Sequence, residues 1–465
     1  MSEPESGVRD GSKPRRGRPP SAGLAERRRD ELTEAAFAVF AELGYEQASV
    51  ADIAKRAGMG QGTLYRYVDG KRELLDLVFD RSVDELMTAI SPDEVIETTA
   101  TGDLAASEAM VEALSRRLFH LVDARPDILK VVMVQAGTVD EELRYRIRGL
   151  YQTFDAMMGR VLAHARDRGW IVTRTDDPET ETVELGRLLP ALGVPGLVMA
   201  LNGDADPARR QAYVRVAVRM SARGLVSDGA RAALRSEPLP SGADADSHEA
   251  RSHDGDAGGR SAELLDAAIA EFVENGYAEV GVKEITERAG VSHGTFYNYF
   301  DSKRHMLSVL IERNRNLLLG RLEGVAATFD EPLTARALYE AVLAVNTGAL
   351  QDIAGRLDEF RFLTFEVPGV DAEAFDDYLR LYREGADRYA AILTAGAEAG
   401  LIEDTVDIAV AAEAWLGYML GAVAAMVSEV DVAAPAESAR VVTNLLLGGA
   451  RPDQPCGRPS AGGRG

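Results

Sequence analysis

Residues 35–75 read AAFAVFAELGYEQASVADIAKRAGMGQGTLYRYVDGKRELL, and residues 267–307 read AAIAEFVENGYAEVGVKEITERAGVSHGTFYNYFDSKRHML. The two stretches align without a gap at a constant offset of 232 (267 − 35 = 232), and about half of their positions are identical. Each stretch begins with apolar residues at helical spacing and continues into two short segments that a glycine separates. This pattern predicts a helix-turn-helix, which is a DNA-reading motif, twice in one polypeptide.

Local signals place the helices of the first copy. Gly44 suits the end of a helix because glycine tolerates positive φ, and Ser49 with Asp52 three residues later is typical of a helix start. Gly58 allows a sharp turn before a second short helix. The recognition helices are therefore expected at Gln61–Tyr67 and His293–Tyr299.

Helical spacing of apolar residues continues along most of the chain, and we find no sustained strand-like alternation. The prediction is an all-α fold of two tandem units, because 465 residues exceed the size of a single core. The expected segments are a basic arm (1–24), the first head (25–75), the first effector region (76–227), a flexible linker (228–260), the second head (261–307), the second effector region (308–449) and a tail (450–465).

The net charge of −23 requires that any DNA binding come from local basic patches. The arm is such a patch, with Arg15, Arg16 and Arg18 in the sequence RRGRP. It is expected either to lie in an A·T-rich minor groove or to act as a sequence-blind phosphate tether.

Other function classes find little support in the sequence. The six histidines show no metal-ligand spacing, the single cysteine lies near the C-terminus, and no nucleophile–base pattern is visible. We expect no enzyme activity and no cofactor. The uncharged run from Ala414 to Val427 is directly preceded by Glu413 and is too short to cross a bilayer. It is therefore interpreted as a core or interface helix and not as a membrane span. With no apolar leader, the expected location is the cytoplasm, at the nucleoid.

The strings GMGQGTLYRYVDGKREL (58–74) and GVSHGTFYNYFDSKRHM (290–306) resemble the tetracycline-repressor (TetR) family of transcription factors. The resemblance implies that three N-terminal helices of each unit bind DNA, and that the helical region behind them holds a ligand pocket and a four-helix dimer bundle. It also implies phosphate contacts, and less firmly base contacts. The implied phosphate contacts are Thr63, Tyr65, Lys71, Thr295, Tyr297 and Lys303, and the implied base contacts are Gln61, Leu64, Arg66, His293, Phe296 and Asn298. Tyr67 and Tyr299 either join this surface or pack the core of each head.

Large apolar side chains in the effector regions suggest where an effector could bind. The candidates are Met133, Phe154, Met158 and Trp170 in the first region, and Phe362, Phe365, Tyr378, Tyr382, Trp415 and Tyr418 in the second. Such residues line apolar ligand pockets, but they also form ordinary helical cores, and the sequence leaves both readings open.

The expected partners are a double-stranded DNA operator and an unidentified small molecule that is apolar or aromatic. The two units either pair within one chain, as a pseudo-dimer, or pair between two chains, as a homodimer. The expected function is that of a repressor released by the small molecule. The alternatives are a sequence-tolerant architectural DNA-binding protein and a small-molecule sensor with degenerate heads.

Overall fold

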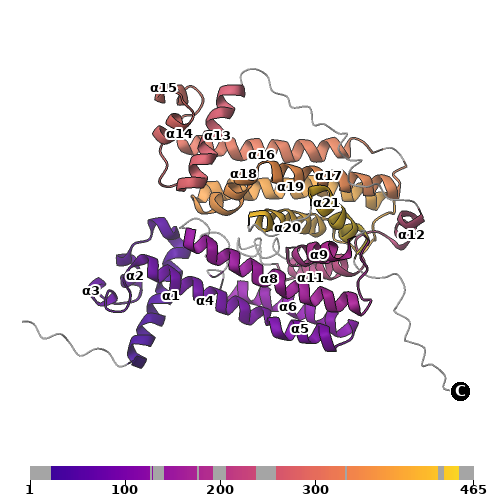
Figure 1. The fold of residues 1–465 in the computed structure, drawn as a ribbon, viewed down its shortest axis with the longest axis horizontal. Helices are drawn as coiled ribbons and strands as arrows, with labels where there is room; N and C mark the ends of the chain where they lie inside the picture. Colours follow the sequence, from indigo (N-terminus) through magenta and orange to yellow (C-terminus); the bar gives the residue numbers. More distant parts are fainter. Residues whose placement is uncertain are drawn as a thin grey trace, which may run out of the picture. The chain divides into compact units, whose positions relative to one another are not determined.

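The structure is a computed structural model that describes residues 22–125, 128, 141–174, 177–191, 206–236, 258–329, 332–427 and 434–449. These residues form helices joined by turns and loops (Figure 1). One isolated antiparallel bridge joins Val226 and Ile402. The all-α prediction is confirmed for this part of the chain. By their contacts, residues fall into two compact units, Met1–Val78 and Phe79–Gly465.

The first head contains α1 (Ala22–Gln47), α2 (Val50–Arg56), α3 (Gln61–Leu64) and the start of α4 (Lys71–Ile90). The helical path of α1 is interrupted at Gly44, where φ is 76°. At the start of α2 the Asp52 N–H donates to the Ser49 hydroxyl over 3.1 Å, and the Ser49 N–H donates to the Asp52 carboxylate over 3.2 Å. Both predicted boundary signals are therefore confirmed.

The described residues of the first effector region form further helices behind the head. They are α5 (Pro92–Thr101), α6 (Leu104–Ala124), α8 (Glu141–Asp167), α9 (Pro178–Ala191) and α11 (Pro207–Ala222). Helix α8 packs against α5 and α9, and an apolar cluster gathers around Leu86, Ile90 and Met157.

The second head repeats the arrangement of the first. Its helices are α13 (Gly258–Asn275), α14 (Val282–Arg288), α15 (His293–Phe296) and the start of α16 (Lys303–Ala326). The second effector region adds α17 (Ala335–Gly355), α18 (Leu357–Arg361), the π-helical turn η4 (Phe362–Glu366), the 3₁₀ turn η5 (Val367–Gly369), α19 (Ala372–Glu398), α20 (Ile408–Val427), α21 (Pro435–Thr443) and the π-helical turn η6 (Asn444–Gly448).

The two effector regions pack against each other within the second compact unit. Helix α9 contacts α20 and α21, and α11 contacts α20 and η6 (Figure 1). One apolar core contains Leu185 and Val216 from the first region together with Trp415 and Leu446 from the second. Both sides of this packing therefore come from the same chain.

Polar contacts follow the same interface. Arg209 of α11 pairs with Glu413 of α20, and the Ser438 hydroxyl donates to the Glu184 carboxylate over 3.1 Å. Glu184 and Glu413 are both buried, so their pairing removes an electrostatic cost that an unpaired buried carboxylate would carry.

The flexible linker predicted for 228–260 is wrong at its start. Residues Asp228–Ser236 form helix α12, which contacts α17 of the second effector region. Ala230 is buried there and Leu234 packs against the shared core. A nine-residue helix is marginal alone, so this tertiary contact is what stabilises it. The second helical unit likewise begins earlier than predicted, at Gly258.

Among the described helices, α20 alone is long and apolar enough to cross a membrane by length and composition. Of its most apolar window, 61% is buried inside the protein, and the helix contacts α9, α11 and α19. These contacts fit the expected core or interface helix.

Candidate nucleic-acid interface

The short helices α3 and α15 are each fixed by one buried side chain. Leu64 and Phe296 are both 0% exposed and lie in the interiors of the two heads. A side chain in that position cannot reach a base edge, so the predicted base contacts of Leu64 and Phe296 are wrong. Both residues anchor the recognition segment instead.

The recognition segments are also less helical than predicted. Helical hydrogen bonding ends at Leu64 and Phe296, and the chain continues through turns to Tyr67 and Tyr299. The Ser292 hydroxyl accepts the Thr295 N–H over 3.2 Å and so caps α15. In the first head Gly60 stands at that position and supplies no side-chain cap.

The remaining recognition residues form an exposed polar and aromatic surface on each head. Gln61, Arg66, His293 and Asn298 are exposed. The rings of Tyr65 and Tyr297 are also open to solvent, at 51% and 52%. Exposed tyrosines present an apolar ring and a hydroxyl at once, which suits contact with sugar and phosphate. Thr63 is exposed and Thr295 half-buried.

The two other tyrosines differ between the heads. Tyr67 is half-buried, whereas Tyr299 is 40% exposed. The core of the first head therefore buries part of the Tyr67 side chain, whereas the core of the second head buries less of the Tyr299 side chain.

The ammonium groups of Lys71 and Lys303 lie against backbone carbonyls inside each head. Lys303 donates to the carbonyl oxygens of Tyr277 over 2.6 Å and Val280 over 2.7 Å. Lys71 donates to the Tyr45 carbonyl oxygen over 2.8 Å. Each ammonium also lies 4.2 Å from the ring centroid of the same tyrosine. Burial lowers the pKa of Lys303, against the opposing effect of Glu279. These internal contacts compete, as an explanation of both lysines, with the phosphate role that the resemblance implies, and that role stays a prediction.

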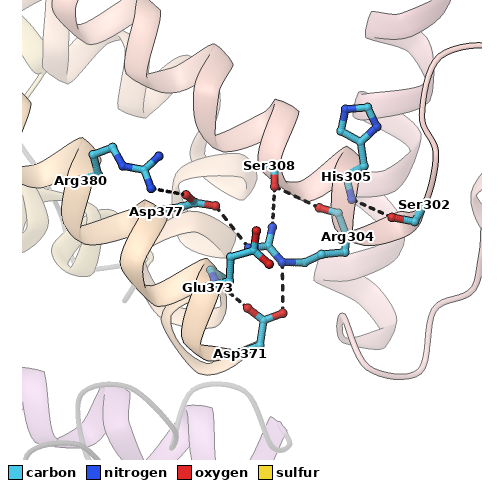
Figure 2. A network of polar contacts seen from close by, with 9 residues as sticks. Ser302, Arg304, His305, Ser308, Asp371, Glu373, Asp377 and Arg380 are labelled. Atoms are coloured by element: carbon cyan, nitrogen blue, oxygen red, sulfur yellow. Dashed lines mark hydrogen bonds and ion pairs between the residues drawn. The ribbon is translucent and has the colours of Figure 1, made fainter.

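Arg304, in the first turn of α16, joins the second head to the second effector region. Its guanidinium contacts the carboxylates of Asp371 at 3.1 Å, Asp377 at 3.3 Å and Glu373 at 3.6 Å, as Figure 2 shows. It also donates to the Ser308 hydroxyl over 2.6 Å. A basic residue opposes the helix dipole at this position, and these three acids offset that cost.

An aromatic contact strengthens the same junction. Phe362 of η4 is fully buried and stacks on Phe272 of α13, with ring centroids 5.1 Å apart. Its neighbour Arg361 donates to the Val273 carbonyl over 3.0 Å. The core of the second head therefore includes residues of the effector region behind it.

The predicted effector residues do not meet in one place. Phe362 and Tyr378 belong to the core of the second head, whereas Tyr382, Trp415 and Tyr418 are buried in the core shared by the effector regions, with Phe365 partly buried beside them. These six residues therefore lie in two separate cores, which fits the helical-core reading better than one shared aromatic pocket. Phe154 and Met158 pack near Met157, Trp170 lies under the Arg168 guanidinium, and Met133 lies outside the described residues.

The core behind these residues is polar as well as aromatic. Trp415 stacks on Tyr389 with centroids 4.2 Å apart, and its indole N–H donates to the Asn346 side chain over 2.7 Å. A small hollow lies between the two effector regions, lined by Glu184, Arg187, Leu350, Tyr418, Met426 and Ser438.

Within the described ranges no group of histidine, cysteine or carboxylate side chains is arranged to hold a metal.

Sequence reasoning missed the residues that hold each head together. Tyr45 and Tyr277 follow Gly44 and Gly276 in both copies, so the repeat itself carried a signal for a shared role. The arginines of the arm, Arg15, Arg16 and Arg18, lie outside the described residues.

Comparison with known proteins identifies both heads. The family model described as bacterial regulatory proteins, tetR family, matches residues 32–78 and 264–310. A curated relative, the HTH-type transcriptional repressor KstR2 of Rhodococcus jostii (strain RHA1), is 31% identical over 158 residues, which is 33% of this chain and 72% of the relative. The fatty acid metabolism regulator protein of Bacillus subtilis (strain 168) is 27% identical over 141 residues, or 30% of this chain and 69% of that protein.

Among solved structures, the transcriptional regulator FadR from Bacillus subtilis in complex with stearoyl-CoA has 23% sequence identity and a TM-score of 0.37, covering 41% of this chain and 99% of that chain. The two family matches coincide with α1–α4 and α13–α16, and with the exposed recognition surfaces described above. The chain therefore belongs to the TetR family of DNA-binding transcriptional regulators and carries two TetR-like units in tandem.

Proposed function

We propose that this chain is a ligand-responsive repressor that binds one operator through two non-identical heads. The observation that carries the proposal is the packing of α9 and α11 on α20 and α21, because one chain thereby supplies both sides of a dimer-like interface. The name of the relative KstR2, a transcriptional repressor, supports the sign of regulation. The dissociation of the protein from DNA when a small molecule binds is what the family resemblance implies.

The proposed DNA contacts follow from exposure. Thr63, Tyr65 and Tyr297 contact phosphate and sugar, together with Thr295, and the arginines of the arm add contacts on the flank of the first head only. The base-reading residues are Gln61 and Arg66 in the first head and His293 and Asn298 in the second. Arginine favours guanine and asparagine favours adenine in the major groove. The operator is therefore expected to have two dissimilar half-sites, separated by roughly one helical turn.

The proposed effector is an apolar or aromatic small molecule. The name of the Bacillus relative, a fatty acid metabolism regulator protein, supports an apolar class. In the first effector region Phe154, Met158 and Trp170 are proposed to contact it, and in the second Tyr382, Trp415 and Tyr418 would have to separate to admit it.

Selection of bound duplexes from a random DNA pool tests the proposal. Two dissimilar half-sites are expected, and Arg66→Ala should relax one of them while Asn298→Ala relaxes the other, at about 1–3 kcal/mol of discrimination each. A perfect palindrome, affected in both halves by each variant, would favour a homodimer of tandem units. Recovery of no preferred sequence would favour the architectural binder, and loss of all DNA binding would favour a sensor with degenerate heads.

A further inference from the structure

The two heads differ in charge, although their sequences align without a gap. Residues 26–75 contain eight lysines and arginines against nine acids, a net charge of −1, and residues 258–307 contain five against eight, a net charge of −3. At the offset of 232, Arg66 of the first head corresponds to Asn298, and Lys55 corresponds to Glu287. All four side chains are exposed, and they lie on the recognition segment or on the helix before it. The second head therefore lacks two cations that the first presents on its helix-turn-helix.

The cations of the second head are held by its own acids and backbone. Arg288 of α14 donates to Glu274 over 3.0 Å and to Glu271 over 2.6 Å, and these hydrogen bonds raise its pKa. Lys283, which the first head replaces by alanine, pairs with Glu287 across 3.7 Å. The remaining cations are also engaged: Arg260 pairs with Glu263 at 2.6 Å, Lys303 donates to backbone carbonyls, and Arg304 contacts three acids (Figure 2). Across residues 258–307, which the structure describes, every lysine and arginine thus has a carboxylate or carbonyl partner.

Lys55 and Arg66 of the first head are not engaged in this way. Both are exposed, and neither forms an ion pair with the part of the chain that the structure describes. The sequence before each head adds to the contrast. The basic arm precedes the first head, whereas residues 241–257, before the second, contain five acids and one arginine. Cations that bind phosphate release counterions from DNA, so contacts by the first head should strengthen as salt falls.

The second head presents a neutral, ordered recognition surface instead. The Ser292 hydroxyl accepts the Thr295 N–H over 3.2 Å, and the two hydroxyl oxygens lie 2.8 Å apart. The His293 ring lies edge-on to Tyr297, with ring centroids 5.4 Å apart. In the first head Gly60 stands at the capping position and offers no side chain. Hydroxyl, amide and aromatic groups contact bases and sugars without displacing phosphate counterions, so such contacts depend little on salt.

We propose that the two heads divide the work of operator binding. The first head, with its arm, supplies the salt-dependent attraction to phosphate, and the second head adds neutral sequence-reading contacts only after the first has bound. A head of net charge −3 whose cations are engaged is repelled by the phosphate backbone, so it does not begin the encounter. Both heads belong to one chain, so once the first has bound, the second meets the DNA in an intramolecular step. This proposal rests on the proposed operator function and assigns the heads unequal roles within it.

Binding of the full chain to a random-sequence duplex tests the division without an operator. Fluorescence anisotropy over a salt series at pH 8 gives the slope of affinity against salt. Lys55→Gln and Arg66→Gln should each make the slope shallower by about 1, because each removes one phosphate contact. Lys283→Gln and Arg260→Gln are the matched variants of the second head and should leave the slope unchanged. These four side chains are exposed, so their substitution leaves the folded state intact.

Three results of this experiment would overturn the division of work. The first is an equal change of slope in the second-head variants, the second is an unchanged slope in the first-head variants, and the third is no binding of random duplex at low salt. Each would show that phosphate attraction does not reside in the first head.

The selected operator supplies the second measurement. Scrambling the half-site that Arg66→Ala relaxes should abolish binding at physiological salt. Scrambling the other half-site should weaken binding about tenfold or more and leave the salt slope unchanged. Two dissimilar half-sites whose loss costs the same affinity and the same slope would refute the division and leave the proposed function standing. A selection that recovers no preferred sequence would refute the proposed function instead, and the random-duplex slopes would still decide where the phosphate attraction lies.

Discussion

The Lys303 ammonium lies 2.6 Å from the Tyr277 carbonyl oxygen and 4.2 Å from the centroid of the same tyrosine's ring. The first head has the same pair in Lys71 and Tyr45, at 2.8 Å and 4.2 Å. The lysine therefore fixes the loop between the first two helices of each head to the start of the helix that follows the recognition segment.

Lys303→Met should destabilise the second head by about 1–3 kcal/mol, because two backbone carbonyls lose a charged donor. Operator affinity should fall while its dependence on salt stays the same. A lysine that contacts phosphate would instead lower the salt slope by about 1. Fluorescence anisotropy over a salt series measures the slope. Lys283→Met serves as control, since Lys283 is 72% exposed and pairs with Glu287 across 3.7 Å.

Phe362→Ala should weaken the second head selectively. Phe362 is fully buried and stacks on Phe272, so truncation leaves a cavity and costs about 3–5 kcal/mol. Hydrogen exchange should accelerate in α13–α16 and stay unchanged in α1–α3. Equal acceleration in both heads would show that Phe362 does not act through this contact.

Tyr389→Phe should stabilise the protein by about 1 kcal/mol or more, because a buried hydroxyl without a partner is removed while the stack on Trp415 remains. Tyr382→Phe is the matched comparison, since the Tyr382 hydroxyl donates to the Glu413 carbonyl oxygen over 3.3 Å. Urea unfolding of both variants measures the difference. A destabilised Tyr389→Phe protein would mean that its hydroxyl has a partner in solution.

Buried tyrosines predict a loss of stability at alkaline pH. Burial raises the pKa of Tyr277 and of Tyr339 to about 12, whereas a tyrosine of the unfolded chain titrates near pH 10. Between about pH 10 and 12 the unfolded state has fewer bound protons than the folded state, so the free energy of unfolding falls as pH rises. Each tyrosine contributes up to about 1.4 kcal/mol per pH unit. Unfolding measurements from pH 9 to 11 should show that the free energy of unfolding falls less steeply with pH for Tyr339→Phe than for the unsubstituted protein.

Arg209→Leu should lower the free energy of unfolding by about 2 kcal/mol, because the buried Glu413 carboxylate loses its cation at the interface of the effector regions. Arg388→Leu is the control, since Arg388 is 54% exposed and pairs with an exposed Glu323.

Light scattering of the unsubstituted protein should give the mass of one chain, 50.1 kDa, at every concentration. A mass that doubles with concentration would contradict internal pairing.

The sequence was most informative where a feature is local and repeated. Ser49 with Asp52, and Gly44, predict helix boundaries because the responsible hydrogen bonds and dihedral angles lie within a few residues. Leu64 and Phe296 were misassigned because a four-residue helix shows no periodicity from which to tell the inner from the outer face.

Long-range contacts explain what the sequence could not show. The partner of Lys303 is a main-chain oxygen, and every residue carries one, so no residue type points to it. Helix α12 resembles a linker in composition and is held by its contact with α17, from the other half of the chain. The aromatic residues of the second effector region divide between two cores because η4 turns Phe362 toward the second head.

The proposed internal pairing of the two effector regions would change how the regulator responds to its own abundance. Separate subunits must meet before they bind an operator, so the active species declines with the square of subunit concentration once dimers dissociate. A chain that carries its own partner has no such step, and the fraction of operators occupied falls only in proportion to the number of chains. Such a protein would still occupy its operator when a cell holds only a few copies of the chain.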